Sequence, residues 1–234
     1  MSITDHWDLI QGTEEWRNAR KGILTASKIE EIITPTLKIA DNKTSRAYLY
    51  SIVAERSSGF KEQEFSSYDM QRGLVEEVYA KDLYSQNIAQ SKDCGFITND
   101  DLGFVIGFSP DGLIGEDGLI EIKSRYPKYQ VQTILDQEVP SEYMPQIQAG
   151  LMVSGRAWCD FISYSNGMPM FVKRVYPDEQ IIEAIKIAAV NFETKAQEML
   201  ADYKIKSKGL IKAERRDYSD TGITPSDNEI IIGV

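Results

Sequence analysis

Apolar residues recur along the chain with two spacings, one typical of helices and one typical of strands. The helical spacing predicts helices over residues 13–20, 27–33, 45–57, 67–85, 141–154 and 178–203. Runs rich in β-branched and aromatic residues predict strands over residues 93–98, 104–108, 119–124, 158–164 and 170–176. Residues 128–137 fit either a helix or an ordered loop. The predicted order of the core is therefore α, β, β, β, α, β, β, α.

Polar residues at the ends of these segments predict where the helices begin. Thr13 precedes a short helix as its cap, and Ser27 with Glu30 matches a capping box, which places Ser27 at a helix N-terminus. In the 67–85 helix a buried stripe is expected, formed by Leu74, Val75, Val78 and Tyr79. Gly73 and Glu77 lie beside that stripe. A glycine inside a helix costs about 1 kcal/mol, so a packing or ligand reason is expected for Gly73.

Candidate chemistry is concentrated in the 119–124 strand and the turn before it. Asp111 precedes a turn-rich stretch, and Glu121 and Lys123 follow in the strand. Side chains alternate along a strand, so Glu121 and Lys123 share one face. Three glycines permit a tight return that would bring Asp111 opposite Glu121: Gly112, Gly115 and Gly118.

Two carboxylates and one ammonium would then converge on one point. Two acids about 5 Å apart repel by roughly 3 kcal/mol at an effective dielectric constant near 20. A divalent cation between them reverses that sign, and hard oxygen ligands favour Mg²⁺ or Mn²⁺. Such a cation acidifies water and polarises a phosphoryl oxygen. The alternative is a charged, solvated strand face.

Length and charge place limits on this interpretation. A chain of 234 residues is long enough for one sizeable core, expected over residues 1–203, with a charged tail over residues 204–234. The net charge of −10 argues against a generic basic nucleic-acid binder. It does not exclude a nuclease, because cations can be confined to a groove or channel. The tail itself is uneven, since residues 204–216 carry six Lys or Arg against one Glu, whereas residues 217–234 carry four acids and no base.

Several classes of protein are disfavoured by what the sequence lacks. No apolar run approaches the length of a membrane span, and the N-terminus has no basic region followed by an apolar stretch, so a cytoplasmic protein without membrane contact is expected. Cys94 and Cys159 are too few for a disulfide framework or an iron–sulfur cluster, and buried free thiols in strands are expected. One histidine argues against zinc.

The Pro-Asp…Glu-x-Lys pattern resembles that of the PD-(D/E)XK nucleases, and the order of elements is similar to their αβββαβ core. Five motifs then follow the order and spacing of the phage lambda-type exonucleases, the viral recombinase family: Trp16–Ser27, Arg72–Glu77, Ser109–Gly112, Glu121–Lys123 and Tyr143–Gln148. The resemblance extends over about residues 7–200. It implies an α/β (α+β) fold with a central mixed β-sheet flanked by helices, as a single nuclease domain.

The resemblance also implies an activity. Members are 5′→3′ exonucleases that degrade one strand of linear double-stranded DNA and leave a 3′ single-stranded tail for a single-strand annealing protein. They depend on Mg²⁺, for which Mn²⁺ can substitute, and two ions per site are expected. They are commonly homotrimeric rings around the DNA, which would confine the basic surface to a channel. The expected setting is the cytoplasm of a bacterial host, with the protein encoded by a phage or prophage.

The resemblance carries roles over to individual residues. Asp111, Glu121 and the backbone carbonyl of Ile122 would hold the metal, with Glu77 as an additional ligand. Neighbouring Glu76 is the register alternative to Glu77. Lys123 would orient or deprotonate the attacking water, or offset charge on the phosphoryl group. Gln146 would position Lys123 or the water.

A second set of matched residues would bind the terminal 5′-phosphate of the DNA: Arg20, Ser27 and Ser109. Arg20 can bind a phosphate bidentately, and a helix N-terminus at Ser27 would favour an anion. Each also has an ordinary structural interpretation. Ser27 could be only a helix cap, and Arg20 only a cation near the end of a helix.

Two segments depart from the family pattern. The loop at residues 34–44 does not align with the arm that reaches into the DNA, so Lys38, Lys43 and Arg46 are only candidates for that role. Residues 204–234 match nothing in the family. They could contact the single-stranded product, a neighbouring subunit or a partner, or form a flexible tail. Two other functions stay open, a structure- or site-specific endonuclease of the same fold and a non-catalytic scaffold that binds DNA ends.

Overall fold

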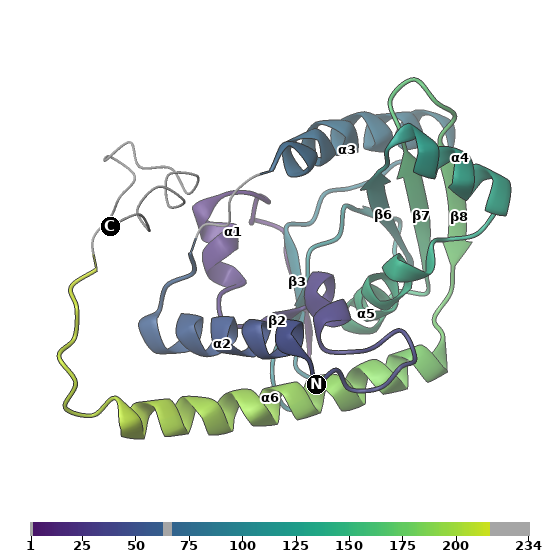
Figure 1. Cartoon of the computed structure of the whole chain (residues 1–234). Helices are drawn as coiled ribbons and strands as arrows, with labels where there is room; N and C mark the ends of the chain where they lie inside the picture. Colours follow the sequence, from purple (N-terminus) through teal and green to yellow (C-terminus); the bar gives the residue numbers. More distant parts are fainter. Residues whose placement is uncertain (1, 63–66, 216–234) are drawn as a thin grey trace, which may run out of the picture.

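The computed structural model describes residues 2–62 and 67–215 and arranges helices around two β-sheets (Figure 1). The N-terminal half contains β1 (Ile3–His6), α1 (Glu14–Ala19), β2 (Leu24–Thr25), the 3₁₀ helix η1 (Ala26–Glu31), α2 (Lys43–Ser58) and α3 (Tyr68–Asn87). The middle contains β3 (Phe96–Asn99), β4 (Ile106–Phe108), β5 (Gly112–Ile114), β6 (Gly118–Ser124) and α4 (Pro127–Asp136). The chain continues with η2 (Ser141–Tyr143), α5 (Met144–Ser154), β7 (Trp158–Tyr164), β8 (Phe171–Val175) and α6 (Glu179–Lys206).

Both sheets are mixed and four-stranded, in the orders β1-β3-β4-β2 and β5-β6-β7-β8. The pairs β2–β4 and β6–β7 are parallel and the others are antiparallel. The expected mixed α/β class is confirmed, with the strands divided between two sheets instead of one. The chain leaves the first sheet after β4 and enters the second at β5. Pro110 lies in this crossing and has no backbone N–H for a strand ladder, which favours a break there.

The main core joins buried residues of both sheets to the helices α2, α5 and α6. The helix α6 turns four residues into this core, Ile185, Ala188, Ala189 and Phe192, all of which are buried. Figure 1 shows α6 along one side of the molecule with α2 beside it, and α3 on the opposite side. Arg56 of α2 forms a bidentate ion pair with Glu193 of α6, with N–O distances of 2.8 and 2.7 Å. This pair fixes the two helices against each other.

The outward face of α3 corrects one expectation. Its four apolar residues are not a buried stripe but are between 57% and 67% exposed: Leu74, Val75, Val78 and Tyr79. The helix instead buries Ala80 and Tyr84 against β6 and β7, and the Tyr84 hydroxyl donates to buried Asp160 at 2.7 Å. The apolar stripe predicted from the sequence therefore lies on the surface of the described chain and not in its core.

The capping box predicted at Ser27 is also wrong. The segment is a six-residue 3₁₀ helix whose cap is Thr25, and no side-chain cap bond forms there. Ser27 lies inside the first turn, with its hydroxyl 3.3 Å from the Thr25 hydroxyl. The cap at Thr13 is confirmed, since its hydroxyl accepts from the Trp16 amide at 3.3 Å. Lys43, expected in a loop, begins α2.

The structure also places residues 128–137, the two cysteines and the end of α6. Residues 128–137 fall in a helix, α4, up to Asp136. Both thiols are free and buried, with Cys159 in β7 and Cys94 just before β3 and not in a strand. The helix α6 continues three residues past the predicted boundary at 203. Residues 216–234 of the predicted tail lie outside the described residues. Among the helices of the described residues, none is long and apolar enough to cross a membrane.

Candidate active site

The hairpin of β5 and β6 brings Asp111 to Glu121 as the sequence predicted. Its register pairs Gly112 with Ile120, so Asp111 lies beside the centre of β6. The backbone N–H of Ile122 donates to Asp111 Oδ2 at 2.6 Å. In a strand the N–H and C=O of one residue point to the same side. The Ile122 carbonyl, which the sequence suggested as a metal ligand, therefore also faces the side of Asp111.

Glu121, Lys123 and Gln146 form a closed triangle of polar contacts. Lys123 Nζ lies 2.8 Å from Glu121 Oε1 and donates to Gln146 Oε1 at 3.0 Å. Gln146 Nε2 donates to the same Glu121 oxygen at 2.5 Å. Gln146 lies in the first turn of α5, directly after Pro145. Its amide thus holds both charged groups of β6 in place. Its expected proximity to Lys123 is confirmed, while its role in catalysis stays a prediction.

Glu77 of α3 reaches the same site, and Glu76 does not. Glu77 lines a cavity with Ile122 and Lys123. Glu76 instead accepts a hydrogen bond from the Ser124 hydroxyl at 2.5 Å. A side chain at Gly73, one turn before Glu77, would meet no other atom within 4 Å, so this glycine leaves open space at the cavity. The structure therefore favours Glu77 over its register alternative.

The three carboxylates perturb one another. Burial, and then the charges of Glu121 and Glu77, raise the pKa of Asp111 well above its usual range. Burial, opposed by Lys81, and the charge of Glu121 raise the pKa of Glu77. Burial alone would lower the pKa of Lys123, but Glu121 and Asp111 outweigh it and raise that pKa. Lys123 is accordingly an ammonium group at neutral pH.

The donor set fits a hard divalent cation. Glu121 is 2% exposed, and its Oε2 atom is buried without a hydrogen-bond partner in the described chain. A buried carboxylate oxygen of this kind is costly unless something binds it. Within residues 2–62 and 67–215, no group of three or more His, Cys, Asp or Glu side chains is arranged so that it could hold a metal ion. Mg²⁺ commonly takes one or two carboxylates and several waters, so the Ile122 carbonyl and water would complete the ligand set.

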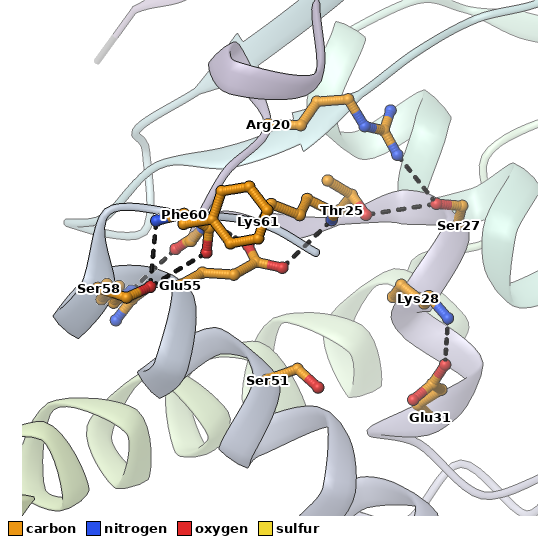
Figure 2. Close-up of polar contacts among 12 residues, drawn as sticks. Arg20, Thr25, Ser27, Lys28, Glu31, Ser51, Glu55, Ser58, Phe60 and Lys61 are labelled. Carbon is orange, nitrogen blue, oxygen red and sulfur yellow. Dashed lines mark hydrogen bonds and ion pairs between the residues drawn. The ribbon is translucent and has the colours of Figure 1, made fainter. Parts of the chain in front are cut away.

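A second cluster joins the three residues predicted to bind a terminal phosphate. Arg20 Nη1 donates to Ser109 Oγ at 2.6 Å. Arg20 Nη2 donates to Ser27 Oγ at 3.4 Å, a contact that Figure 2 shows. The sheet explains this convergence, because β2 and β4 are parallel and Thr25 pairs with Gly107. Ser27 follows the end of β2 by two residues and Ser109 follows the end of β4 by one, so both lie just beyond the same end of this strand pair.

Sequence reasoning missed the part that Trp16 plays in this cluster. The Trp16 indole N–H lies 3.0 Å from Ser109 Oγ and 2.9 Å from the Gly95 carbonyl oxygen. The guanidinium of Arg20 stacks over the Trp16 ring, 4.3 Å from its centroid. Trp16 lies one turn before Arg20 in α1, and this i, i+4 spacing was the available signal.

Two residues of α2 bind the backbone of the turn that follows Arg20. Glu55 accepts a hydrogen bond from the backbone N–H of Gly22 at 2.6 Å, and Arg56 donates to the carbonyl of the same glycine at 2.8 Å. Figure 2 shows Glu55 below the strand that carries Thr25. Lys61 also contacts Glu55, with its Nζ atom 3.4 Å from Glu55 Oε1. Both backbone groups of Gly22 are thereby fixed, which limits the movement of the segment that carries Arg20.

The two clusters are continuous. Ser109 belongs to the Arg20 cluster and Asp111 to the carboxylate site, and only Pro110 separates them. Gln11 donates to the Pro110 carbonyl at 2.8 Å and so ties this link to the N-terminal segment. A group bound at Arg20 would consequently lie next to the carboxylates.

Comparisons with known proteins agree with this arrangement. Residues 15–157, more than half of the chain, match the model of the YqaJ-like viral recombinase domain. The structure is similar to the alkaline exonuclease LHK-Exo from Laribacter hongkongensis, with a TM-score of 0.75 and 29% identity over 85% of this chain and all of that one. It is equally similar to LHK-Exo in complex with dAMP, at 30% identity over the same shares and a TM-score of 0.75.

A more distant structure shares only the fold. The phage-related exonuclease from Haemophilus somnus 129PT gives a TM-score of 0.57 at 12% identity, over 79% of this chain and 98% of that one. Among curated proteins, none matches this sequence. The family match and the similarity to LHK-Exo together support an exonuclease.

Proposed function

Because the chain belongs to the YqaJ-like viral recombinase family, we propose that it is a metal-dependent exonuclease that degrades the 5′-ended strand of linear double-stranded DNA. The observation that carries this proposal is the continuity of the Arg20 cluster with the carboxylate site through Ser109 and Asp111. A cluster suited to a terminal phosphate beside a hydrolytic site makes the strand enter with its 5′ end first.

The chemistry follows from the side chains of the site. Asp111, Glu121, Glu77 and the Ile122 carbonyl would hold Mg²⁺, for which Mn²⁺ could substitute, and we propose two ions per site. When bound, the metal supplies an acidified water and polarises a phosphoryl oxygen. Lys123 lies 2.8 Å from Glu121 Oε1, where it would offset negative charge on the phosphoryl group, or orient or deprotonate the attacking water.

The product is expected to be a mononucleotide with its own 5′-phosphate. One end of the terminal nucleotide would lie at Arg20 and the other at the carboxylates. The crystal structure of LHK-Exo with dAMP supports a product of this class. Removal of such units leaves a 3′ single-stranded tail, which we propose is passed to a single-strand annealing protein in the host cytoplasm.

We also propose a homotrimeric ring. The exposed apolar face of α3, from Leu74 to Tyr79, supports burial against another chain, because contiguous apolar surface of this kind commonly marks an interface. A ring also reconciles the net charge of −10 with DNA binding, since only the channel needs to be basic. The oligomeric mass in solution tests this directly, and a monomer at micromolar concentration would contradict it.

One experiment tests the activity and its polarity. Linear duplex labelled at the 5′ or the 3′ end is incubated with Mg²⁺ or with a chelator, with the 5′-phosphate present or removed. We expect release of the 5′ label first, only with metal, and faster from phosphorylated ends. Cleavage of a circular duplex would favour the endonuclease alternative, and the absence of released nucleotides would favour the scaffold.

A further inference from the structure

A cavity of about 380 Å³ opens beside Lys123. It is lined by Glu77, Ile122 and Lys123 at its catalytic end and, beyond them, by Arg72, Arg125, Tyr126 and Tyr129. Of the described residues that line it, none belongs to the Arg20 cluster. The cavity lies where β6 ends and α4 begins. The proposed reaction leaves four of the lining residues without a role: Arg72, Arg125, Tyr126 and Tyr129.

The far end of this cavity has an aromatic ring that is held in place from two directions. The Arg72 guanidinium lies over the Tyr126 ring, 3.9 Å from its centroid. The Tyr126 hydroxyl donates to Asp69 at 2.5 Å, and Asp69 lies one turn before Arg72 on α3. Tyr126 nevertheless stays 42% exposed. A ring that is fixed before binding loses little conformational freedom when a ligand stacks on it.

The wall beside Tyr126 is cationic and also rigid. Arg125 is buried between two rings, with its guanidinium 5.2 Å from the centroids of both Tyr129 and Tyr143. It donates to the Tyr143 hydroxyl at 2.5 Å and to Glu142 at 3.2 Å. The Nε atoms of Arg72 and Arg125 are buried and have no partner in the described part of the chain. Aromatic platforms with arginines are the chemistry that binds nucleobases and their phosphates in single strands.

We propose that this cavity is the subsite for the nucleotide immediately 3′ of the scissile phosphate, with its base stacked on Tyr126. The inference rests on the proposed exonuclease function. With the terminal phosphate at Arg20 and the scissile phosphate at Asp111 and Glu121, the next nucleotide continues past Lys123 into the cavity. The strand that remains after each cut is thereby held while the released mononucleotide leaves from the other side.

The test combines one protein change with one DNA change. Wild type and Tyr126→Ala are compared in single-turnover release of the 5′-terminal nucleotide. Each acts on a duplex with an intact or an abasic second nucleotide in the degraded strand. Loss of a base–aromatic stack corresponds to roughly a five- to hundredfold effect. We expect about a tenfold loss from either change alone and no further loss from the two together.

Three matched variants sharpen the result. Tyr126→Phe keeps the ring and is expected to keep the sensitivity to the abasic nucleotide, although it loses the bond to Asp69. Tyr126→Leu keeps apolar bulk and should show the same non-additivity if the alanine variant is unstable. Tyr176→Ala removes a ring that is 63% exposed and lies outside the cavity, and it should behave as wild type.

The outcomes separate this inference from the proposed function. If wild type releases no nucleotide from linear duplex, the proposed function fails and the subsite with it. If wild type is active but Tyr126→Ala still loses tenfold from the abasic nucleotide, only the subsite is wrong. The same holds if sensitivity appears only when the abasic position is in the complementary strand.

Discussion

Replacement of Arg20 by alanine is expected to remove the preference for 5′-phosphorylated ends. Arg20 has its two terminal nitrogens directed at Ser109 and Ser27, at 2.6 and 3.4 Å, so its fork already faces the proposed phosphate position. A hydrogen bond between charged groups contributes about 1.5–3 kcal/mol. The value of kcat/KM on phosphorylated ends should therefore fall by about 10- to 150-fold.

The assay is the ratio of kcat/KM on 5′-phosphate ends to that on 5′-hydroxyl ends. This ratio is insensitive to the fraction of folded enzyme, which affects both substrates equally. Arg17→Ala, on the same helix, removes a cation that donates to the Gly12 carbonyl and should leave the ratio unchanged. Arg20→Lys keeps the charge but not the fork and should give an intermediate ratio.

Two results would refute this reasoning. An unchanged ratio in Arg20→Ala would remove Arg20 from the phosphate site. An equal fall on both ends would mean that the residue acts structurally, through its stacking on Trp16.

Three further changes have defined outcomes. Lys123→Ala should abolish hydrolysis while DNA-end binding, measured by fluorescence anisotropy, stays within a few fold of wild type, and retained turnover would contradict its role. Burial and neighbouring carboxylates raise the pKa of Asp111, so without metal the free energy of unfolding falls as pH rises through that raised pKa. In buffers above neutral pH and without metal, Asp111→Asn should therefore raise the Tm by a few degrees. The same variant should lose the stabilisation that added Mg²⁺ gives to wild type, and an unchanged Mg²⁺ effect would contradict the proposed metal site. Gly107→Ala should lower the free energy of unfolding by about 1–3 kcal/mol in a denaturant titration, because the new Cβ would lie 2.2 Å from the Phe96 ring, and an unchanged midpoint would contradict that packing.

The carboxylate site could be predicted because its geometry is mostly local. Alternation along one strand places Glu121 and Lys123 together, and a tight hairpin returns Asp111 to them. The Arg20 cluster could be anticipated only through family motifs. Its members meet because two short parallel strands end side by side, and β2 is too short at two residues to leave a periodic signal.

The failures have physical causes as well. Helical periodicity identifies an apolar face of α3 but cannot say whether the same chain covers that face. The capping box at Ser27 requires an α-helix, and the segment forms a tighter 3₁₀ turn with a different cap. The contribution of Trp16 depends on its distance to Ser109, which lies 93 residues away in the chain and has no local pattern.

The helix α3 has a consequence for how assembly would relate to metal binding. Glu77 reaches the cavity beside Lys123, and the adjoining surface of the same helix presents Leu74, Val75 and Val78 to solvent. A helix of 20 residues transmits a restraint on one side to the other, because its backbone moves as a unit. Any chain that covers the apolar side would thus restrict the position of Glu77. By linkage, metal affinity should then rise with protein concentration, and added metal should strengthen self-association by the same factor.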